Sequence, residues 1–266
     1  MTYDPAIPSD IPVASARFYQ AVYDTAAEIH ERYNIGTYRE KKLHLILKRY
    51  FEPDPAYHEI PCAGFIADIL RDGHITEIES NSLTGLHEKL DAYLPEYTVD
   101  IVYPLAANRF VTWIDPATGD MSQKRRSPKK ATVYDAIAEC IRLRSYLRKP
   151  GLRILAAFLD IEEYRLLDGW SRDRKRGSHR YERIPQELHR IVVLDGTDSY
   201  ARFIPENCPD PCTVREFASA AGIQRDRART VLHVMEAVGA MENCGKRKRE
   251  LLFRRVQSAA KEETLL

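Results

Sequence analysis

The sequence has few cysteines, no long apolar run and almost no net charge. Five cysteines in 266 residues are too few and too scattered for a disulfide framework, so a reducing compartment is expected. No stretch approaches the roughly 18–20 apolar residues that span a bilayer, and the first residues lack the basic-then-apolar pattern of a signal peptide. We therefore expect a cytoplasmic protein without a membrane partner.

Several catalytic signatures are missing. The sequence has no Gly-rich phosphate loop, no Gly-x-Ser-x-Gly and no His-Glu-x-x-His, so the usual markers of P-loop, serine-hydrolase and zinc-protease chemistry are absent. Cys208 and Cys212 are close in sequence, but no second pair or His-x3-His completes a zinc site. We expect both to be small, half-buried side chains in a Pro-rich connector.

Positive charge gathers in three windows, although the whole chain carries only +1. Windows 121–130, 171–180 and 246–255 carry net charges of +5, +4 and +5, which leaves the remainder acidic. Such segregation predicts a phosphate-binding surface, with DNA as the partner; the alternative is three solvated loops that aid solubility. The residues expected to bind DNA there are Lys124, Arg125, Arg126, Lys129, Lys130, Arg172, Arg174, Lys175, Arg176, Lys246, Arg247, Lys248 and Arg249.

Hydrophobic periodicity predicts an α/β core. The expected elements are a helix from about residue 40 to 50, strands at 57–62, 65–70 and 75–79, a helix at 83–93, and a strand at 99–103 ended by Pro104. The order indicates that the last helix and strand form a crossover connection.

Further elements follow this core. They are a hairpin of 109–114 with 124–126, a helix at 132–147, and strands at 154–159 and 163–167, with Glu162 and Glu163 facing water. Three prolines between 205 and 211 indicate a domain boundary. We therefore expect two domains, 1–204 and 205–266.

Acidic residues flank a predicted tight turn. Asp72-Gly73 between two apolar strands is the preferred two-residue hairpin turn, and it sets a register in which Asp68 faces Glu77. Glu79, two positions further, projects on the same side, so three acids converge. Like charges at such a site predict a compensating cation, with Mg²⁺ as the sharpest hypothesis. The alternative is a solvated edge hairpin with ordinary acids.

These residues and the order of the elements, over roughly residues 40–104, resemble the core of the PD-(D/E)xK nuclease superfamily. The resemblance implies a restriction-endonuclease-like mixed sheet flanked by helices. By position, Asp68 and Glu77 would be metal ligands and Glu40 an assisting acid. Glu79 stands where the family usually has Lys; some restriction endonucleases also have Glu at this position. Lys89 on the following helix would supply the displaced ammonium. For Lys89 the alternative is an ordinary surface lysine.

The implied chemistry is phosphodiester hydrolysis with Mg²⁺, for which Mn²⁺ would substitute. The metal at Asp68 and Glu77 would polarise the phosphate and lower the pKa of a bound water, while Glu79 or Lys89 orients or deprotonates that water.

Residues 212–256 resemble a winged helix-turn-helix domain. Thr213 and Glu216 have capping-box spacing, Gly222 ends the first helix, and a second helix follows with Arg225, Arg227 and Arg229 near its start. Recognition helices contact DNA at this position. Two strands, with Lys246 to Arg249 at their tip, would form the wing. The alternative is a small helical bundle used for dimerisation.

The sequence therefore predicts a metal-dependent DNA endonuclease with a winged helix, and analogy suggests a restriction, defence or repair setting. The rival hypothesis is a non-catalytic DNA-binding regulator whose nuclease-like domain serves dimerisation or ligand sensing. RNA as substrate and a homodimer as the assembly are left open.

Overall fold

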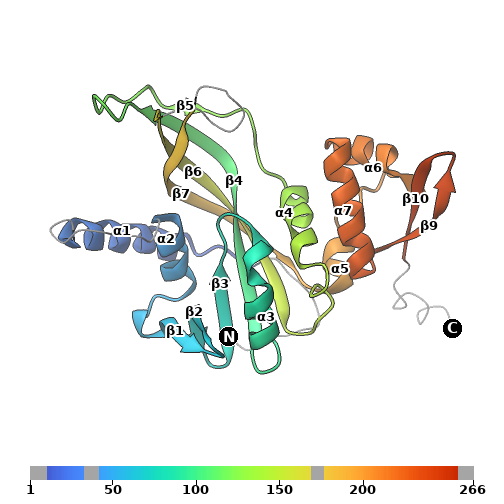
Figure 1. Ribbon diagram of the computed structural model, residues 1–266, viewed down its shortest axis with the longest axis horizontal. Coiled ribbons are helices and arrows are strands. Elements are labelled where there is room, and N and C mark those ends of the chain that lie inside the picture. Colours follow the sequence, from blue (N-terminus) through green and yellow to red (C-terminus); the bar gives the residue numbers. More distant parts are fainter. Residues whose placement is uncertain (1–10, 33–41, 169–176, 257–266) are drawn as a thin grey trace.

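The chain is a mixed α/β protein built on one large mixed sheet flanked by helices (Figure 1). The computed structural model describes residues 11–32, 42–168 and 177–256. Within these residues the large sheet has seven strands in the order β1-β2-β3-β4-β6-β7, with β5 paired to β4. The strands are β1 (His58–Cys62), β2 (Phe65–Arg71), β3 (His74–Ile78), β4 (Thr98–Ile114), β5 (Arg125–Arg126), β6 (Leu152–Leu166) and β7 (His179–Leu194).

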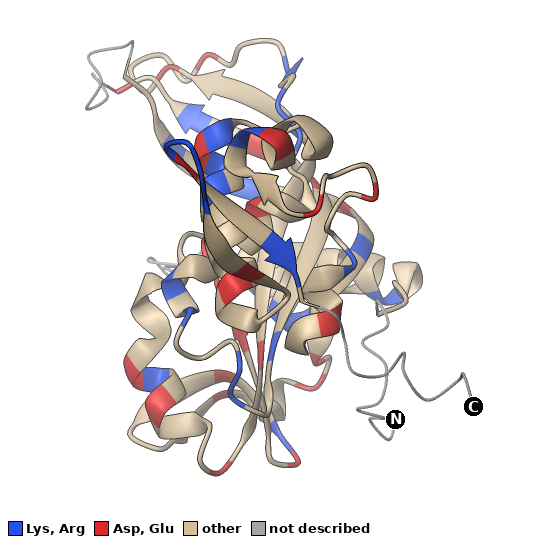
Figure 2. Ribbon diagram, turned by 90° about the vertical axis from the view of Figure 1, so that its right-hand side faces the viewer, with Lys and Arg blue, Asp and Glu red and all other residues tan. Residues whose placement is uncertain are grey.

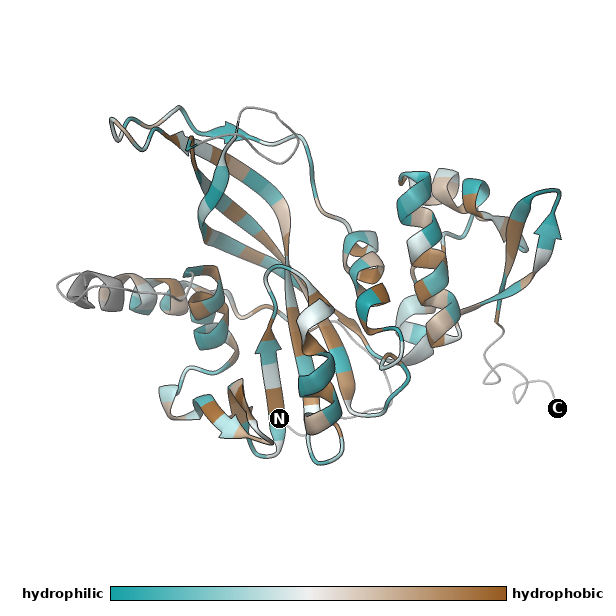
Figure 3. Ribbon diagram, viewed as in Figure 1, coloured by the Kyte–Doolittle hydropathy of each residue, from teal (hydrophilic) through white to brown (hydrophobic). Residues whose placement is uncertain are grey.

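Helices cover the two faces of this sheet. They are α1 (Ser15–Arg32), α2 (Lys42–Phe51), α3 (His87–Tyr93), α4 (Val133–Glu139) and α5 (Gly196–Ala201), with 3-10 turns η1 (Pro55–Tyr57), η2 (Leu83–Leu86) and η3 (Cys140–Leu143). Successive residues of β6 join different apolar clusters, Ile154 with α3 and α4, and Leu155 with α1 and α2. Strand side chains alternate between faces, so the sheet separates two cores. Figure 3 shows the hydrophobic positions along the central strands.

The predicted hairpin and crossover are confirmed. Asp72 and Gly73 have φ of 51° and 76°, as a tight turn between right-twisted strands requires. The β2–β3 ladder pairs Arg71 with His74, Leu70 with Ile75 and Ile69 with Thr76, and it ends there, so the predicted pair of Asp68 with Glu77 does not belong to it. β3 then runs parallel to β4, which is reached through η2 and α3.

The prediction that Pro104 ends the fourth strand is wrong, because β4 continues from Thr98 to Ile114. The Val102 carbonyl accepts a hydrogen bond of 2.9 Å from the Glu79 N–H, so Val102 faces β3. Pro104, two residues on, faces the same way, but β3 pairing ends at Val102. Because Pro104 has no strand beside it on that side, its missing N–H removes no hydrogen bond from the sheet.

The extents of three other elements also differ from the predictions. Strands 154–159 and 163–167 are one strand, β6, because β4 and β7 pair with it along its length. The helix expected at 132–147 is α-helical only to Glu139 and tightens into η3. β7 was not expected; it contains Pro185, which an edge strand tolerates.

Cys208 and Cys212 are buried rather than half-buried.

The C-terminal unit contains the predicted helices and hairpin. Its elements are β8 (Cys212–Thr213), α6 (Val214–Ala221), α7 (Arg225–Val238), β9 (Met241–Arg247) and β10 (Glu250–Arg255), with the strands in the order β8-β10-β9. The Thr213/Glu216 capping box is present, and Gly222 ends α6 with a φ of 65°. The apolar residues of α6 and α7 belong to the same buried cluster as those of α3 and α4. The domains expected at 1–204 and 205–266 thus share one continuous core.

No helix in the described part of the chain combines the length and the apolar character needed to cross a bilayer.

Candidate active site

Asp68 lies where β2 and β3 separate. Beyond the pair Ile69–Thr76 the Asp68 carboxylate takes the place of a backbone partner, since its Oδ2 accepts a 2.8 Å hydrogen bond from the Ile78 N–H. The tight turn four residues away sets this position. The carboxylate therefore sits between the two strands.

His44 on α2 holds the same carboxylate oxygen. Its Nε2 lies 3.0 Å from Asp68 Oδ2, and both side chains are mostly buried. Burial is the largest single influence on the pKa of Asp68 and would raise it, but the hydrogen bond and charge of His44, the Ile78 N–H and the charge of Lys89 together lower the pKa. Sequence reasoning missed His44; the available signal was a polar residue between buried Leu43 and Leu45 on the helix that precedes the sheet.

Glu77 is a buried carboxylate with one partnered oxygen. Its side chain is 3% exposed, and Oε2 accepts a 2.7 Å hydrogen bond from Lys89 Nζ on α3. Oε1 is buried and has no hydrogen-bond partner within the usual distance and angle limits among the described residues; the buried Tyr93 hydroxyl, which also has none, lies near Glu77, and burial followed by the charge of Glu77 raises the pKa of Tyr93. Burial, followed by the charge of Asp68, raises the pKa of Glu77 to about 7. An ionised Glu77 therefore lacks part of the stabilisation that water would give it.

Glu79 lies at the end of β3 and is half-buried. Burial, and then the negative charge of Asp68, raises its pKa, while Lys89 and His44 act in the opposite direction. The structure thus brings Asp68, Glu77, Glu79 and Lys89 into one electrostatic group to which His44 also belongs. Glu40, expected as the assisting acid, lies outside the described residues.

The expectation that the three acids converge as one cradle is wrong in detail. Each of Asp68 and Glu77 is held by its own basic partner, His44 from the helix on one face and Lys89 from the other. In residues 11–32, 42–168 and 177–256, the group with three possible ligand atoms within 4.8 Å is instead Asp160, Glu187 and His189.

The carboxylates of Asp68 and Glu77 are hard oxygen donors of the kind that Mg²⁺ takes. Mg²⁺ takes one or two carboxylates and keeps several waters, so a three-residue cage is not required. The unpartnered Oε1 of Glu77 is the observation that favours a cation, because a buried carboxylate oxygen without a donor is destabilised.

The predicted DNA-binding residues have varied surroundings, and Figure 2 shows positive and negative positions interspersed over much of the ribbon. Residues 172–176 lie outside the described residues. Ion pairs or hydrogen bonds within the protein are made by Lys124 (Glu162), Arg126 (Asn108), Arg225 (Glu250), Arg227 (Asp135), Arg229 (Asp226) and Arg247 (Glu216). Exposed are Arg125, Lys129, Lys130, Lys246, Lys248 and Arg249. The pair Arg227–Asp135 joins the start of α7 to α4.

Glu77 predicts a pH dependence of stability. Between its ordinary value of 4.5 and about 7, the folded state keeps a proton that the unfolded state has released. Rising pH therefore lowers the free energy of unfolding over this window. We expect Glu77→Gln to become progressively more stable relative to wild type from pH 5 to pH 7.5, measured by urea denaturation in EDTA. Parallel stability curves for the two proteins would contradict the raised pKa.

Comparison with known proteins gives a family without an assigned activity. Residues 41–195 match a family described as a domain of unknown function, DUF8091. An uncharacterized protein of Treponema pallidum (strain Nichols) is 26% identical over 167 residues, which cover 62% of this chain and 64% of that protein. No solved structure shows a significant match. The matched family region contains β1 to β7 with Asp68, Glu77 and Lys89, and the chain belongs to the DUF8091 family.

Proposed function

We propose that the chain is a metal-dependent endonuclease that hydrolyses phosphodiester bonds of DNA. The observation that carries this proposal is the buried Glu77 with an unpartnered oxygen, next to Asp68 at the point where β2 and β3 separate. The ion pair with Lys89 engages only Oε2 of Glu77. A free buried oxygen beside a second carboxylate instead suits a divalent cation.

The order of the elements supports the same proposal. A helix, three strands with the acids on the second and third, a helix and a parallel strand are similar to the restriction-endonuclease-like core of the PD-(D/E)xK superfamily. Lys89, from the crossover helix α3, lies 2.7 Å from Glu77 and stands in for the lysine that Glu79 replaces.

Each side chain has a proposed role in hydrolysis. Asp68 and Glu77 would hold Mg²⁺, which supplies polarisation of the phosphate and a more acidic water. Glu79, whose raised pKa suits a general base, takes a proton from the attacking water as its oxygen bonds to phosphorus. The leaving sugar oxygen departs with the electrons of the broken P–O bond and acquires a proton. The Lys89 ammonium offsets negative charge that develops on the phosphate.

The C-terminal unit would supply affinity for duplex DNA. We propose that residues 212–256 act as a winged helix, with the exposed cations at the tip of the β9–β10 hairpin contacting the phosphate backbone. Such contacts position the duplex without reading its sequence.

The proposal is tested with supercoiled plasmid. Purified wild-type chain is expected to nick or linearise it in Mg²⁺ or Mn²⁺ and to leave it intact in EDTA. Binding in all three conditions, without cleavage in either metal, would reject the nuclease.

A second candidate is a non-catalytic DNA-binding regulator. The ion pair between Lys89 and Glu77 favours it, because this pair neutralises the buried carboxylate without a metal. In that case added Mn²⁺ would leave the thermal stability of the protein unchanged.

His44 is proposed as a positioning residue that orients Asp68. His44→Ala is expected to weaken Mn²⁺ binding by roughly 10–100-fold, as loss of a hydrogen bond to a ligand usually does. His44→Gln, which keeps an N–H donor, should recover part of this affinity. Titration with Mn²⁺ in the absence of DNA measures both, and equal affinities in Ala and Gln variants would argue against positioning through the hydrogen bond.

A further inference from the structure

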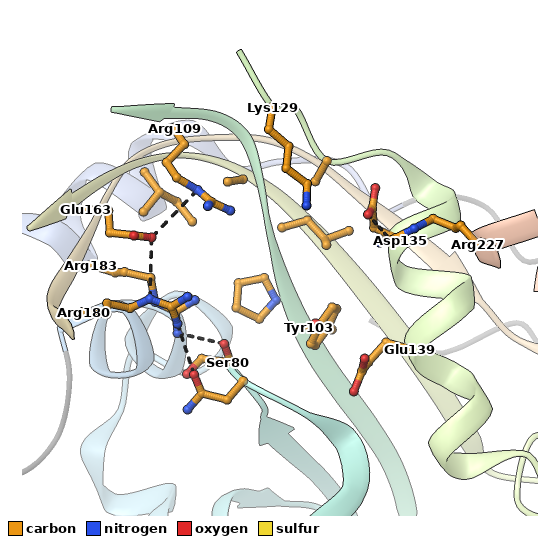
Figure 4. Close-up of a pocket in the computed structure, with 16 residues that line it drawn as sticks. Ser80, Tyr103, Arg109, Lys129, Asp135, Glu139, Glu163, Arg180, Arg183 and Arg227 are labelled. Carbon is orange, nitrogen blue, oxygen red and sulfur yellow. Dashed lines mark hydrogen bonds and ion pairs between the residues drawn. The ribbon is translucent and has the colours of Figure 1, made fainter. Parts of the chain in front are cut away.

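A cavity of about 280 Å³ lies beyond the end of β3 and is lined by residues of β4, β7 and α4 (Figure 4). Ser80 and Asn81, which follow Glu79 directly in the chain, line one side of it. Arg109 from β4 and Arg180 and Arg183 from β7 line the cationic end. Tyr103 and Pro104 of β4 also line the cavity, and Asp135 and Glu139 of α4 line its other side.

The cationic end holds more positive than negative charge. Glu163 is buried rather than facing water as expected, with its side chain 1% exposed. Arg109 Nε and Arg180 Nε lie 3.8 and 3.6 Å from its Oε2, and Arg165 donates a 2.6 Å hydrogen bond to its Oε1. One carboxylate thus faces several guanidinium groups.

Arg183 is a buried guanidinium group in which one N–H lacks an acceptor among the described residues. It is 8% exposed, and its Nη2 donates a 2.8 Å hydrogen bond to the Ser80 carbonyl. Its Nε is buried without an acceptor among the described residues. Burial, followed by the charge of Arg180, lowers the pKa of Arg183 to about 10. A buried guanidinium with a free N–H and cationic neighbours favours an anionic ligand.

We propose that Arg109, Arg180 and Arg183 bind a phosphate of a polynucleotide strand whose neighbouring phosphate lies at the candidate active site. The planar guanidinium groups match the paired oxygens of a phosphodiester. The cavity exceeds a single phosphate ion in size, and the Tyr103 ring offers a surface for a sugar or base. The polynucleotide as ligand rests on the proposed function, whereas the excess of cations in the cavity does not.

The Arg183–Ser80 contact also links this site to the carboxylates. Ser80 is one residue from Glu79, so a phosphate held by Arg183 lies against the segment that positions Glu79. The polynucleotide strand would thereby lie at a fixed distance from the carboxylates of the candidate active site.

The test measures binding of a fluorescently labelled single-stranded oligonucleotide in EDTA, where no cleavage occurs. Arg180→Gln and Arg183→Gln are each expected to weaken binding at least about tenfold. Each should also reduce the slope of log affinity against log salt concentration by about one. Arg183→Lys, which keeps the charge, should lose less. Arg190→Gln is the matched control, since Arg190 is exposed on the same strand β7 and does not line the cavity, and it is expected to change affinity less than about threefold. Circular dichroism verifies folding of each variant.

Competition separates the possible sources of the phosphate. Unlabelled oligonucleotide should compete at far lower concentration than inorganic phosphate or a nucleoside monophosphate. Equal competition by inorganic phosphate, or wild-type affinity in both Arg180→Gln and Arg183→Gln, would overturn the proposal. Loss of binding in these variants, together with a wild type that cleaves no DNA, would reject the nuclease and retain the phosphate site.

Discussion

Asp68→Asn and Glu77→Gln are each expected to lower metal-dependent DNA cleavage by about 10³-fold. Both substitutions keep the size of the side chain and remove the negative charge that would hold Mg²⁺. DNA affinity in EDTA should change less than about threefold, since the proposed phosphate contacts lie elsewhere. Cleavage rates of supercoiled plasmid and binding isotherms measure the two effects separately.

Glu88→Gln is the matched control for these variants. Glu88 is exposed on α3, next to Lys89 in sequence, and the substitution removes the same charge. Its cleavage rate should equal that of wild type. Full activity of Asp68→Asn and Glu77→Gln would show that the hydrolytic centre lies at other residues.

Phe217→Ala is expected to destabilise the protein by about 3–5 kcal/mol, the usual effect of truncating a buried phenylalanine. Phe217 on α6 is fully buried, and its ring packs edge-on against Tyr134 of α4 with centroids 6.2 Å apart. Because α4 belongs to the large domain, this contact joins the two expected domains. We therefore expect one cooperative unfolding transition that shifts as a whole, observed by urea denaturation followed through circular dichroism.

Tyr181→Ala serves as the comparison for Phe217→Ala. Tyr181 on β7 is 56% exposed, so its truncation should change the free energy of unfolding by less than about 0.5 kcal/mol. Two separate transitions, with Phe217→Ala shifting one of them, would mean that the C-terminal unit unfolds independently despite the shared core.

Local features were well predicted because neighbouring residues determine them. Asp72-Gly73 can adopt the positive φ angles of a tight turn, and the hairpin register follows from that turn. The capping box at Thr213 and the left-handed Gly222 likewise bound α6 through contacts within a few residues. These signals predict the hairpin and the bounds of α6, but they did not predict β7 or the full lengths of β4 and β6.

Errors arose where pairing across the sheet outweighed a local signal. Pro104 reads as a strand end, yet β4 passes through it because its missing N–H faces a side from which β3 has departed. Glu163 reads as a solvated acid, yet arginines from β4 and β7 surround it. Neither outcome depends on nearby sequence.

The sequence alone determined the turn, the caps and the side of the sheet on which alternate residues lie, since these follow from φ preferences and a two-residue period. Which basic side chain contacts each acidic one was decided by the tertiary structure. His44 reaches Asp68 from 24 residues away, Lys89 reaches Glu77 from 12, and Arg183 reaches Ser80 from 103. Contacts at such separations arise from the packing of helices on the sheet and from the positions of distant strands within it, for which no short motif carries the information.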